Sequence, residues 1–316
     1  MRDDVRYRVS LDYKPSRREA ASIISERIKE GMVSGNSKDT FHSYALKYIE
    51  LKENTLSPST IRSYGSTVKS MPEYFLHMKL QDIAQPDIDK LINDVAKTHK
   101  AKTVRNYHGL ISAVIKEYRP HMQLHTKLPQ KEKYAYITPE RSEIDTLFET
   151  VKGTRYDIAY RLGCYGLRRS EVCALTATDL NGNTLTINKA YIRNKNNEWI
   201  IKPHGKTTES NRSIYIDDYL ADLIREKEGR LFEGYPTRLN DHLKELQKRL
   251  NMPHFRFHDL RAYYASMAHA MGIPDAYIMA NGGWSSPHVM QRVYRRAMDD
   301  EKAKMNQIFA KNLFNT

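Results

Sequence analysis

The chain has 316 residues, and its 51 lysines and arginines against 38 aspartates and glutamates give a formal net charge of +13. No stretch approaches the ~20 consecutive apolar residues that a membrane span needs, and the first eight residues lack the apolar run of a secretory signal. The only cysteines, Cys164 and Cys173, exclude a disulfide framework and favour a reducing cytosol. The excess positive charge indicates a polyanionic partner, most often nucleic acid, with a merely basic enzyme as the alternative.

Residues 1–36 contain the pattern of two short elements. Alternating residues from Val5 to Leu11 predict a strand, and Ser16 is a typical cap for the helix expected behind it. Because one strand and one helix cannot bury a core, this piece indicates the end of something larger, followed by a linker of low hydrophobicity.

Helical periodicity runs from 37 to 120 and predicts a small bundle of four amphipathic helices. The second helix is expected to start with Ser57 as its cap and Pro58 in its first turn. The four apolar faces consist of Phe41, Tyr44, Ala45, Tyr48 and Ile49; Ile61, Tyr64, Val68 and Met71; Ile88, Leu91, Ile92 and Val95; and Val104, Tyr107, Leu110, Ile111, Val114 and Ile115.

Basic side chains lie opposite these apolar faces. We expect them to contact DNA phosphates, with an ordinary solvated face as the alternative. They are Arg62, Lys69, Lys97, Lys100, Lys102 and Arg105.

A second domain is expected after a linker over 121–137, which carries Pro129 and has little helical pattern. Helices are predicted from Thr138 and around Tyr156–Leu167, and most of the chain after Asp218 is helical. Three β-like runs separated by turn residues lie between them, at 184–187, 198–202 and 212–216. The predicted fold class is therefore mainly α with a small antiparallel β-sheet (α+β).

Several common catalytic signatures are missing. The sequence has no phosphate-binding Gly-x-x-x-x-Gly-Lys-Ser/Thr loop, no Gly-x-Gly-x-x-Gly fingerprint and no Gly-x-Ser-x-Gly elbow. His254 and His258 have the spacing of metal ligands on a helix, but Pro253 argues against a regular helix, and no cysteine or acidic cluster completes a zinc set. We expect neither a metal ion nor a cofactor.

Four short motifs remain, and each carries a cationic or nucleophilic side chain. They are Gly166-Leu-Arg168-Arg-Ser-Glu171, Gly205-Lys206-Thr207 between two predicted strands, His258-Asp-Leu-Arg261, and Gly282-Gly-Trp284, which precedes Tyr294 by ten residues.

This order of motifs over about 130 residues resembles the tyrosine recombinases, the family of phage and conjugative-element integrases and Xer recombinases. The resemblance covers nearly the whole chain and implies a C-shaped clamp on DNA. It implies that 37–120 form a helical core-binding (SAM-like) domain and that 138–316 form a catalytic domain with a C-terminal docking helix. Residues 1–36 are similar to the last strand and helix of an arm-binding domain, so they would be a remnant and a linker.

The chemistry of phosphodiester cleavage fits these residue types. The phosphate needs fixed cations for its developing charge, and the planar guanidinium donates bidentately and stays charged, so Arg168 and Arg261 would hold the non-bridging oxygens. His258 would bond the same phosphate and handle the tyrosine proton, while Lys206 would protonate the departing 5′ oxygen.

Trp284 stands where many relatives have a second histidine. An indole N–H can donate to phosphate but cannot carry a proton away, so its role would be positioning and packing. Tyr294 would attack to give a 3′-phosphotyrosine and a free 5′-hydroxyl, and the energy stored in that linkage makes ATP unnecessary for ligation. The scheme also needs no metal ion, in keeping with the missing motifs. The interval from Trp284 to Tyr294 is one residue longer than the commonest family spacing.

Each assignment has a structural alternative. Arg168 could simply pair with Glu171, Lys202 competes with Lys206, and Trp284 could be a core aromatic alone. His258 and Arg261 could belong to a helix-cap cluster, and Tyr294 is one of 21 tyrosines.

The last residues, 300–313, have a narrow apolar seam typical of an amphipathic helix. By resemblance this helix would dock in trans and link four protomers on two DNA duplexes, and an excision factor would assist. The expected function is site-specific recombination of double-stranded DNA at the ends of a mobile element, through a Holliday junction, in the bacterial cytoplasm at the nucleoid. The alternatives are a type IB topoisomerase-like enzyme and a non-catalytic DNA-binding protein.

Overall fold

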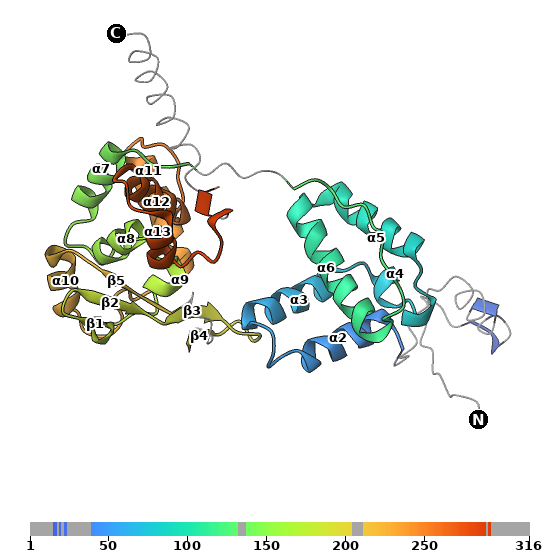
Figure 1. Cartoon of the computed structure of the whole chain (residues 1–316). Coiled ribbons are helices and arrows are strands. Elements are labelled where there is room, and N and C mark those ends of the chain that lie inside the picture. Colours follow the sequence, from blue (N-terminus) through green and yellow to red (C-terminus); the bar gives the residue numbers. More distant parts are fainter. Residues whose placement is uncertain are drawn as a thin grey trace, which may run out of the picture. The chain divides into compact units, whose positions relative to one another are not determined.

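The computed structural model describes residues 15–17, 19, 22–23, 39–131, 137–203, 211–288 and 290–291. The chain divides into two compact units, Met1–Lys133 with Arg193–Glu198, and Tyr134–Ile192 with Trp199–Thr316 (Figure 1). Near the start, the Ser16 hydroxyl accepts from the Glu19 backbone N–H, and the Glu19 carboxylate accepts from that of Ser16. This reciprocal pair confirms Ser16 as a cap, whereas the strand expected before it lies outside the described residues.

The first unit contains the four predicted helices. Ser57 caps the second of them with Pro58 in its first turn, as expected. The helices are α2 (Phe41–Leu51), α3 (Pro58–Ser70), α5 (Gln85–Thr98) and α6 (Ala101–Tyr118), with the short α4 (Glu73–Leu76) and η1 (Leu80–Asp82) between α3 and α5.

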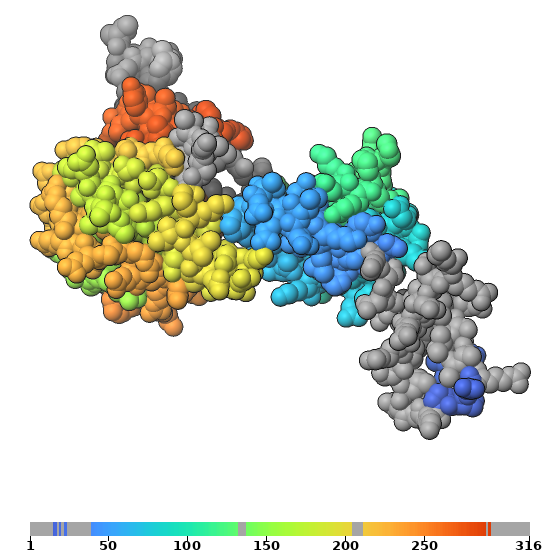
Figure 2. All heavy atoms as spheres, turned by 90° about the horizontal axis from the view of Figure 1, so that it is seen from below, coloured from blue at the N-terminus to red at the C-terminus, as the bar shows by residue number. Residues whose placement is uncertain are grey.

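Helix α6 packs against α2, α3 and α5. The apolar residues that the periodicity assigned to its inner face are all buried, and α2 presents its other face at the surface (blue in Figure 2). Sequence periodicity of 3.6 residues therefore predicted the core of this unit correctly.

Part of the segment expected to be a linker packs on this first unit. Arg119 donates to the backbone oxygens of Leu80 and Ile83, and the Arg105 side chain donates to the oxygen of Pro129. Met122, Leu124 and Leu128 lie against the apolar core. Residues 119–129 are thus an extended segment that side-chain hydrogen bonds and apolar contacts, rather than pairing with a β-strand, hold against the first unit.

From Arg141 onward the chain is helical with a β insertion. In order, its elements are α7 (Arg141–Val151), α8 (Asp157–Cys164), α9 (Arg169–Val172), η2 (Ala177–Asp179), β1 (Leu180–Asn181), β2 (Thr184–Ile187), β3 (Lys189–Arg193), β4 (Trp199–Pro203), β5 (Arg212–Tyr215), α10 (Asp218–Arg225), α11 (Pro236–Arg249), η3 (Phe257–Asp259), α12 (Leu260–Ala270) and α13 (Asp275–Gly282).

The predicted fold class, mainly α with a small amount of antiparallel β-structure, is confirmed, although the strands form two sheets rather than one. Strands β1, β2 and β5 make one antiparallel sheet, with Leu185 opposite Ile214, and β3 with β4 makes a second. The strict burial alternation of β2 and β5 made them recognisable. Strand β1 has only two residues, and β3 lacks alternation because four of its five residues are half-buried.

The helix predicted from Thr138 begins instead at Arg141. The Glu143 carboxylate accepts from the backbone N–H of Glu140, and this bond fixes Glu140 as the cap. Pro139 is buried just before that cap.

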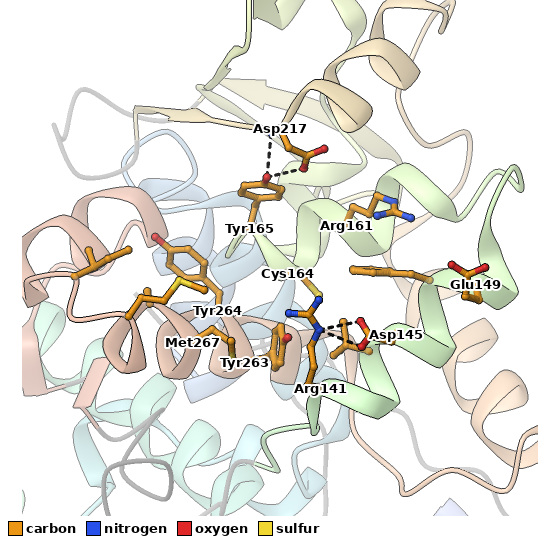
Figure 3. Close-up of a pocket in the computed structure, with 15 residues that line it drawn as sticks. Arg141, Asp145, Glu149, Arg161, Cys164, Tyr165, Asp217, Tyr263, Tyr264 and Met267 are labelled. Carbon is orange, nitrogen blue, oxygen red and sulfur yellow. Dashed lines mark hydrogen bonds and ion pairs between the residues drawn. The ribbon is translucent and has the colours of Figure 1, made fainter. Parts of the chain in front are cut away.

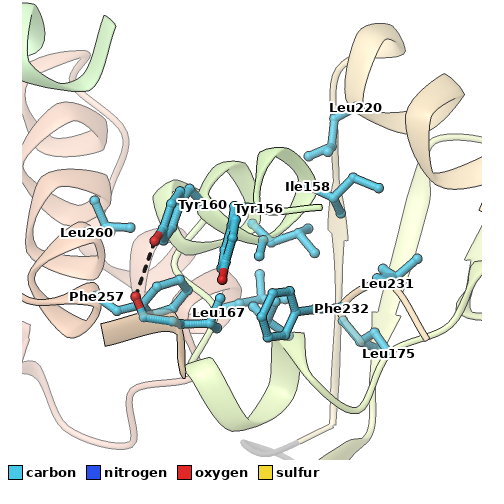
Figure 4. Close-up of a cluster of buried hydrophobic side chains, with 14 of the residues drawn as sticks. Tyr156, Ile158, Tyr160, Leu167, Leu175, Leu220, Leu231, Phe232, Phe257 and Leu260 are labelled. Atoms are coloured by element: carbon cyan, nitrogen blue, oxygen red, sulfur yellow. Dashed lines mark hydrogen bonds between the residues drawn. The ribbon is translucent and has the colours of Figure 1, made fainter. Parts of the chain in front are cut away.

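Helix α8 lies at the centre of the second unit. It contacts α7, α9, α10 and α12, and its Ile158 and Tyr160, with Tyr156 at its N-cap, enter the main apolar cluster (Figure 4). The Tyr160 hydroxyl donates to the backbone oxygen of Leu239 in α11. Helix α8 therefore holds α12 in position, and α12 carries Arg261 in its first turn, directly after η3 with His258.

None of the helices in the described parts of the chain is long and apolar enough to cross a membrane.

The close packing of α12 on α8 can be tested by substitution of Gly163. A Cβ at this position would lie 2.8 Å from Leu260 Cδ1 and 2.9 Å from Phe257 Cζ. We therefore expect Gly163→Ala to lower the free energy of unfolding by about 1–3 kcal/mol through overpacking, as measured by calorimetric unfolding. Gly65→Ala is the control, because nothing lies within 4 Å of its added Cβ in α3, and alanine is the better helix former by ~1 kcal/mol. Equal effects of the two substitutions would contradict this view of the interface.

Candidate active site

Arg168 lies at the N-terminus of α9, where its position is held by its own motif. Its backbone N–H donates to Glu171 Oε2 at 2.8 Å, and its Nη1 donates to Glu171 Oε1 at 2.7 Å. Its Nη2 donates to the backbone oxygen of Gly283 at 2.8 Å. The side chain is still 40 % exposed, so a fixed guanidinium remains open to solvent on one side.

Glu171 is fully buried and also accepts from a second arginine. Arg212 Nη2 donates to Glu171 Oε2 at 2.8 Å and Arg212 Nη1 to Oε1 at 3.2 Å. Burial alone would raise the pKa of Glu171, but the hydrogen bonds and charges of Arg212 and Arg168 lower it to about 2. The carboxylate therefore stays ionised and binds two guanidinium groups.

Arg261 is the other arginine predicted to bind the phosphate oxygens, and it forms the phosphate clamp together with Arg168. It lies in the first turn of α12 and is only 2 % exposed. It donates to the backbone oxygen of Gly166, two residues before Arg168. Its guanidinium carbon lies 4.5 Å from the centre of the Trp284 ring, in a cation–π contact. The turn before it is fixed by the buried Asp259, which accepts from the backbone N–H of Arg256 at 2.8 Å.

His258 precedes Arg261 in η3 and keeps an exposed surface. Desolvation of the ring and then the positive charge of Arg261 lower the pKa of His258 to about 4, with smaller contributions from Arg256 and Arg168. The imidazole is therefore neutral near pH 7 in the DNA-free protein, as a group that accepts a proton must be.

Trp284 is buried, and its ring face lies against the Arg261 guanidinium. Its ring stacks on Tyr264 with 6.3 Å between ring centres. Gly283 before it is left-handed, with φ of 66°, a conformation that favours glycine. A Cβ on Gly282 would lie 1.9 Å from the Trp284 ring.

The structure thus gathers Arg168, His258, Arg261 and Trp284 at one place in the second unit. Lys206 and Tyr294 lie outside the described residues. They follow Pro203 at the end of β4 and Gln291 after Trp284, respectively.

Five of the predicted DNA-contacting residues lie on two helices of the first unit, and the sixth, Lys97, lies near the end of α5, where it pairs with Asp94. Arg62 and Lys69 are on α3, whereas Lys100, Lys102 and Arg105 are at or near the start of α6. A polar cavity of about 340 Å³ lies between these helices, lined by Ser59, Thr60, Ser63, Tyr64, Arg105, Asn106 and Gly109.

The sequence motifs gave Glu171 and Arg212 no role in the site, although Glu171 ends the first quoted motif and Arg212 begins the predicted β-like run 212–216. A signal was present for Arg212, because it shares the inward face of β5 with Ile214. An arginine at a buried position of an alternating strand needs a buried anion as its partner.

In the described part of the chain, no group of three or more His, Cys, Asp or Glu side chains could hold a metal ion.

Comparison with known families decides between the alternatives. Residues 40–96 match the N-terminal SAM-like domain of phage integrases, and residues 140–301, more than half of the chain, match the phage integrase family. The chain belongs to the phage integrase family. This integrase is therefore a tyrosine-type site-specific DNA recombinase, and the assignment does not support the topoisomerase-like alternative. No curated protein matches its sequence.

Solved structures share the fold of the integrase. The Tn1549 transposon integrase in complex with transposon right end DNA has a TM-score of 0.67 at 14 % identity, covering 85 % of this chain and 99 % of that one. A lambda integrase tetramer bound to a Holliday junction has a TM-score of 0.61 at 16 % sequence identity, and the match covers 89 % of this chain and 88 % of that one. The XerH recombinase bound to a palindromic difH substrate has a TM-score of 0.61 at 13 % sequence identity, and the match covers 85 % of this chain and 97 % of that one.

The lowered pKa of His258 has a consequence for stability. Because its folded-state pKa lies below the unfolded value, the folded protein binds fewer protons between about pH 4 and 6.5. The contribution of His258 to the free energy of unfolding is therefore highest above pH 6.5, where the ring is neutral in both states, and this contribution decreases as the pH falls toward 4. We expect the melting temperature of the DNA-free integrase to fall more steeply over this range than that of His258→Asn. A difference between the two proteins that does not vary with pH would contradict the assigned environment.

Proposed function

We propose that this integrase cuts and rejoins the ends of a mobile element through a 3′-phosphotyrosine on Tyr294 and exchanges strands through a Holliday junction. The observation that carries the proposal is the convergence of Arg168, His258 and Arg261 beside Trp284, with both arginines held by buried or backbone partners. Pre-oriented cations of this kind stabilise charge that develops in a transition state without further reorganisation.

Each described side chain has a part in this scheme. Arg168 and Arg261 bind the non-bridging oxygens of the scissile phosphate, and the neutral His258 accepts the proton of the attacking tyrosine. The bond from Tyr294 Oη to phosphorus forms while the bond from phosphorus to the 5′ oxygen breaks, and Lys206 donates a proton to that oxygen. Trp284 holds Arg261 in place through its ring face.

In this proposal the first unit binds the DNA backbone. The polar cavity between α3 and α6 offers hydroxyl and amide groups, and exposed Lys69, Lys100 and Lys102 lie on the same two helices. Hydroxyl, amide and basic groups are those that bind DNA phosphates and sugars. We accordingly propose 37–120 as the core-binding domain, 121–137 as the linker and 138–316 as the catalytic domain, with 1–36 as an arm-domain remnant.

Docking of the C-terminal helix on a neighbouring protomer is proposed with a defined acceptor. A cavity of about 570 Å³ lies among α7, α8 and α12 (Figure 3). Its lining combines aromatic and aliphatic side chains with the charged Arg141, Asp145, Glu149, Arg161 and Asp217. Met271 and Ile273 at its edge are 68 % and 39 % exposed. We propose that residues 300–313 of a second copy dock here through the apolar seam that their sequence predicts, and four such contacts would close a ring on two DNA duplexes. An excision factor stays a prediction.

The chemistry is tested by covalent trapping. We expect the integrase, mixed with nicked duplexes carrying the ends of its own element, to form an adduct that resists denaturant without metal or ATP. Peptide mapping should place the DNA on Tyr294. The matched control is Tyr277→Phe, at a nearby exposed tyrosine, which should leave the adduct unchanged, whereas Tyr294→Phe should abolish it. An adduct on another tyrosine would contradict the site, and binding without any adduct would favour a non-catalytic DNA-binding protein.

Docking in trans is tested by shortening the chain to Met1–Arg295. Loss of the apolar seam should leave binding to a single DNA site intact but remove assembly of four protomers, as measured by sedimentation of the DNA complexes. Ile273→Asp in the full chain should produce the same defect from the acceptor side, because it places a charge at the apolar edge of the cavity. Normal assembly by the shortened chain would refute docking.

A further inference from the structure

Arg212 is an enclosed side chain next to the segment that carries Lys206. It is the first residue of β5, six positions after Lys206, and its side chain is 5 % exposed. All three guanidinium nitrogens are bonded, since Nη1 and Nη2 donate to Glu171 and Nε donates to the backbone oxygen of Asn281 at 2.6 Å. The guanidinium therefore has one orientation.

The partners of Arg212 lie on separate elements of the site. Glu171 is on α9 beside Arg168, and Asn281 is in the last turn of α13, three residues before Trp284. A Cβ on Gly283 would lie 3.0 Å from Arg212 Nη1, so the backbone of this turn closes tightly around the guanidinium. One side chain thus joins β5 to two elements that hold the phosphate clamp.

Stability alone does not account for such an arrangement. A buried ion pair often contributes no more than well-packed apolar residues would, because desolvation offsets the attraction. What a buried arginine adds is orientation, since its planar fork binds a carboxylate in a fixed geometry that a lysine cannot reproduce. The contact therefore fixes where β5 begins.

We propose that Arg212 is a positioning residue: by anchoring the start of β5 to Glu171 and to the end of α13, it sets where Lys206 meets the leaving 5′ oxygen. The inference rests on the proposed function. Six residues of extended chain span at most about 20 Å, so the anchor at Arg212 limits the positions that Lys206 can reach.

The same geometry distinguishes the positioning role of Arg212 from the binding of phosphate by Arg168 and Arg261. Without Arg212, Arg168 keeps its two bonds to Glu171 and its bond to the oxygen of Gly283. Loss of Arg212 should therefore impair the donation of the proton and leave the binding of the phosphate oxygens largely intact.

Changing the leaving atom isolates the proton step. With an ordinary phosphate, the bond from phosphorus to the 5′ oxygen breaks and the oxygen takes a proton from Lys206. With a 5′-bridging sulfur, the bond from phosphorus to sulfur breaks and a thiolate leaves, which needs no proton because thiols ionise near pH ~8.5. A defect in the proton donor slows the first reaction and spares the second.

The experiment compares Arg212→Lys with the unaltered integrase on nicked duplexes of its own element that carry oxygen or sulfur at this position. We expect cleavage of the oxygen substrate to slow about 10–100-fold, the size of a misplaced catalytic group, and cleavage of the sulfur substrate to change less than about 3-fold. Lys206→Ala should show the same pattern. Because both rates come from one preparation, their ratio does not depend on the fraction of folded protein.

Two further variants complete the comparison. Arg230→Lys is the matched control, because Arg230 is a half-buried arginine of the same unit that donates to the oxygen of Cys173 and lies over the Tyr191 ring; its ratio should not change. Arg212→Gln should reproduce the result of Arg212→Lys. An unchanged ratio, or equal losses on both substrates, overturns the inference alone, whereas failure of the unaltered integrase to cut either substrate overturns the proposed function with it.

Discussion

A single buried carboxylate, Glu171, fixes both Arg168 and Arg212 in the candidate active site. It accepts from the backbone and side chain of Arg168 and from both terminal nitrogens of Arg212. One negative charge between two fixed cations leaves a net charge of +1, and Arg168 remains partly open to solvent. A phosphate bound by Arg168, as proposed, would meet a cation that is already oriented, so that little of the binding energy would be needed to order it.

The second half of the clamp has a different construction. Arg261 is buried between the backbone of Gly166 and the ring of Trp284, and its helix α12 is seated on α8. The two halves meet at the loop over 166–168 and at the turn of Gly283, whose oxygen accepts from Arg168. Packing in the core and geometry in the site are therefore coupled, because a shift of α12 would move His258 and Arg261 together.

Periodicity predicted much of the fold, since the four helices of the first unit and the alternating strands β2 and β5 each bury one face. It missed β3, which has no buried face, and it placed the start of α7 three residues early, because a capping bond rather than hydrophobicity sets that boundary. Arg168, His258 and Arg261 were predicted from the order of their motifs. The pairing of Arg168 with Glu171 was among the alternatives drawn from sequence. The pairing of Glu171 with Arg212 was not predicted, because it joins residues 41 positions apart and depends on tertiary structure.

The central claim is that Arg168 and Arg261 neutralise the charge of the scissile phosphate. Its most direct test replaces one non-bridging oxygen of that phosphate with a methyl group, which removes the negative charge. The account predicts that Arg168→Ala, inactive on the ordinary phosphate, regains cleavage on the neutral one, because less charge then develops in the transition state. Equal inactivity of Arg168→Ala on both substrates, with the unaltered integrase active on each, would contradict the account.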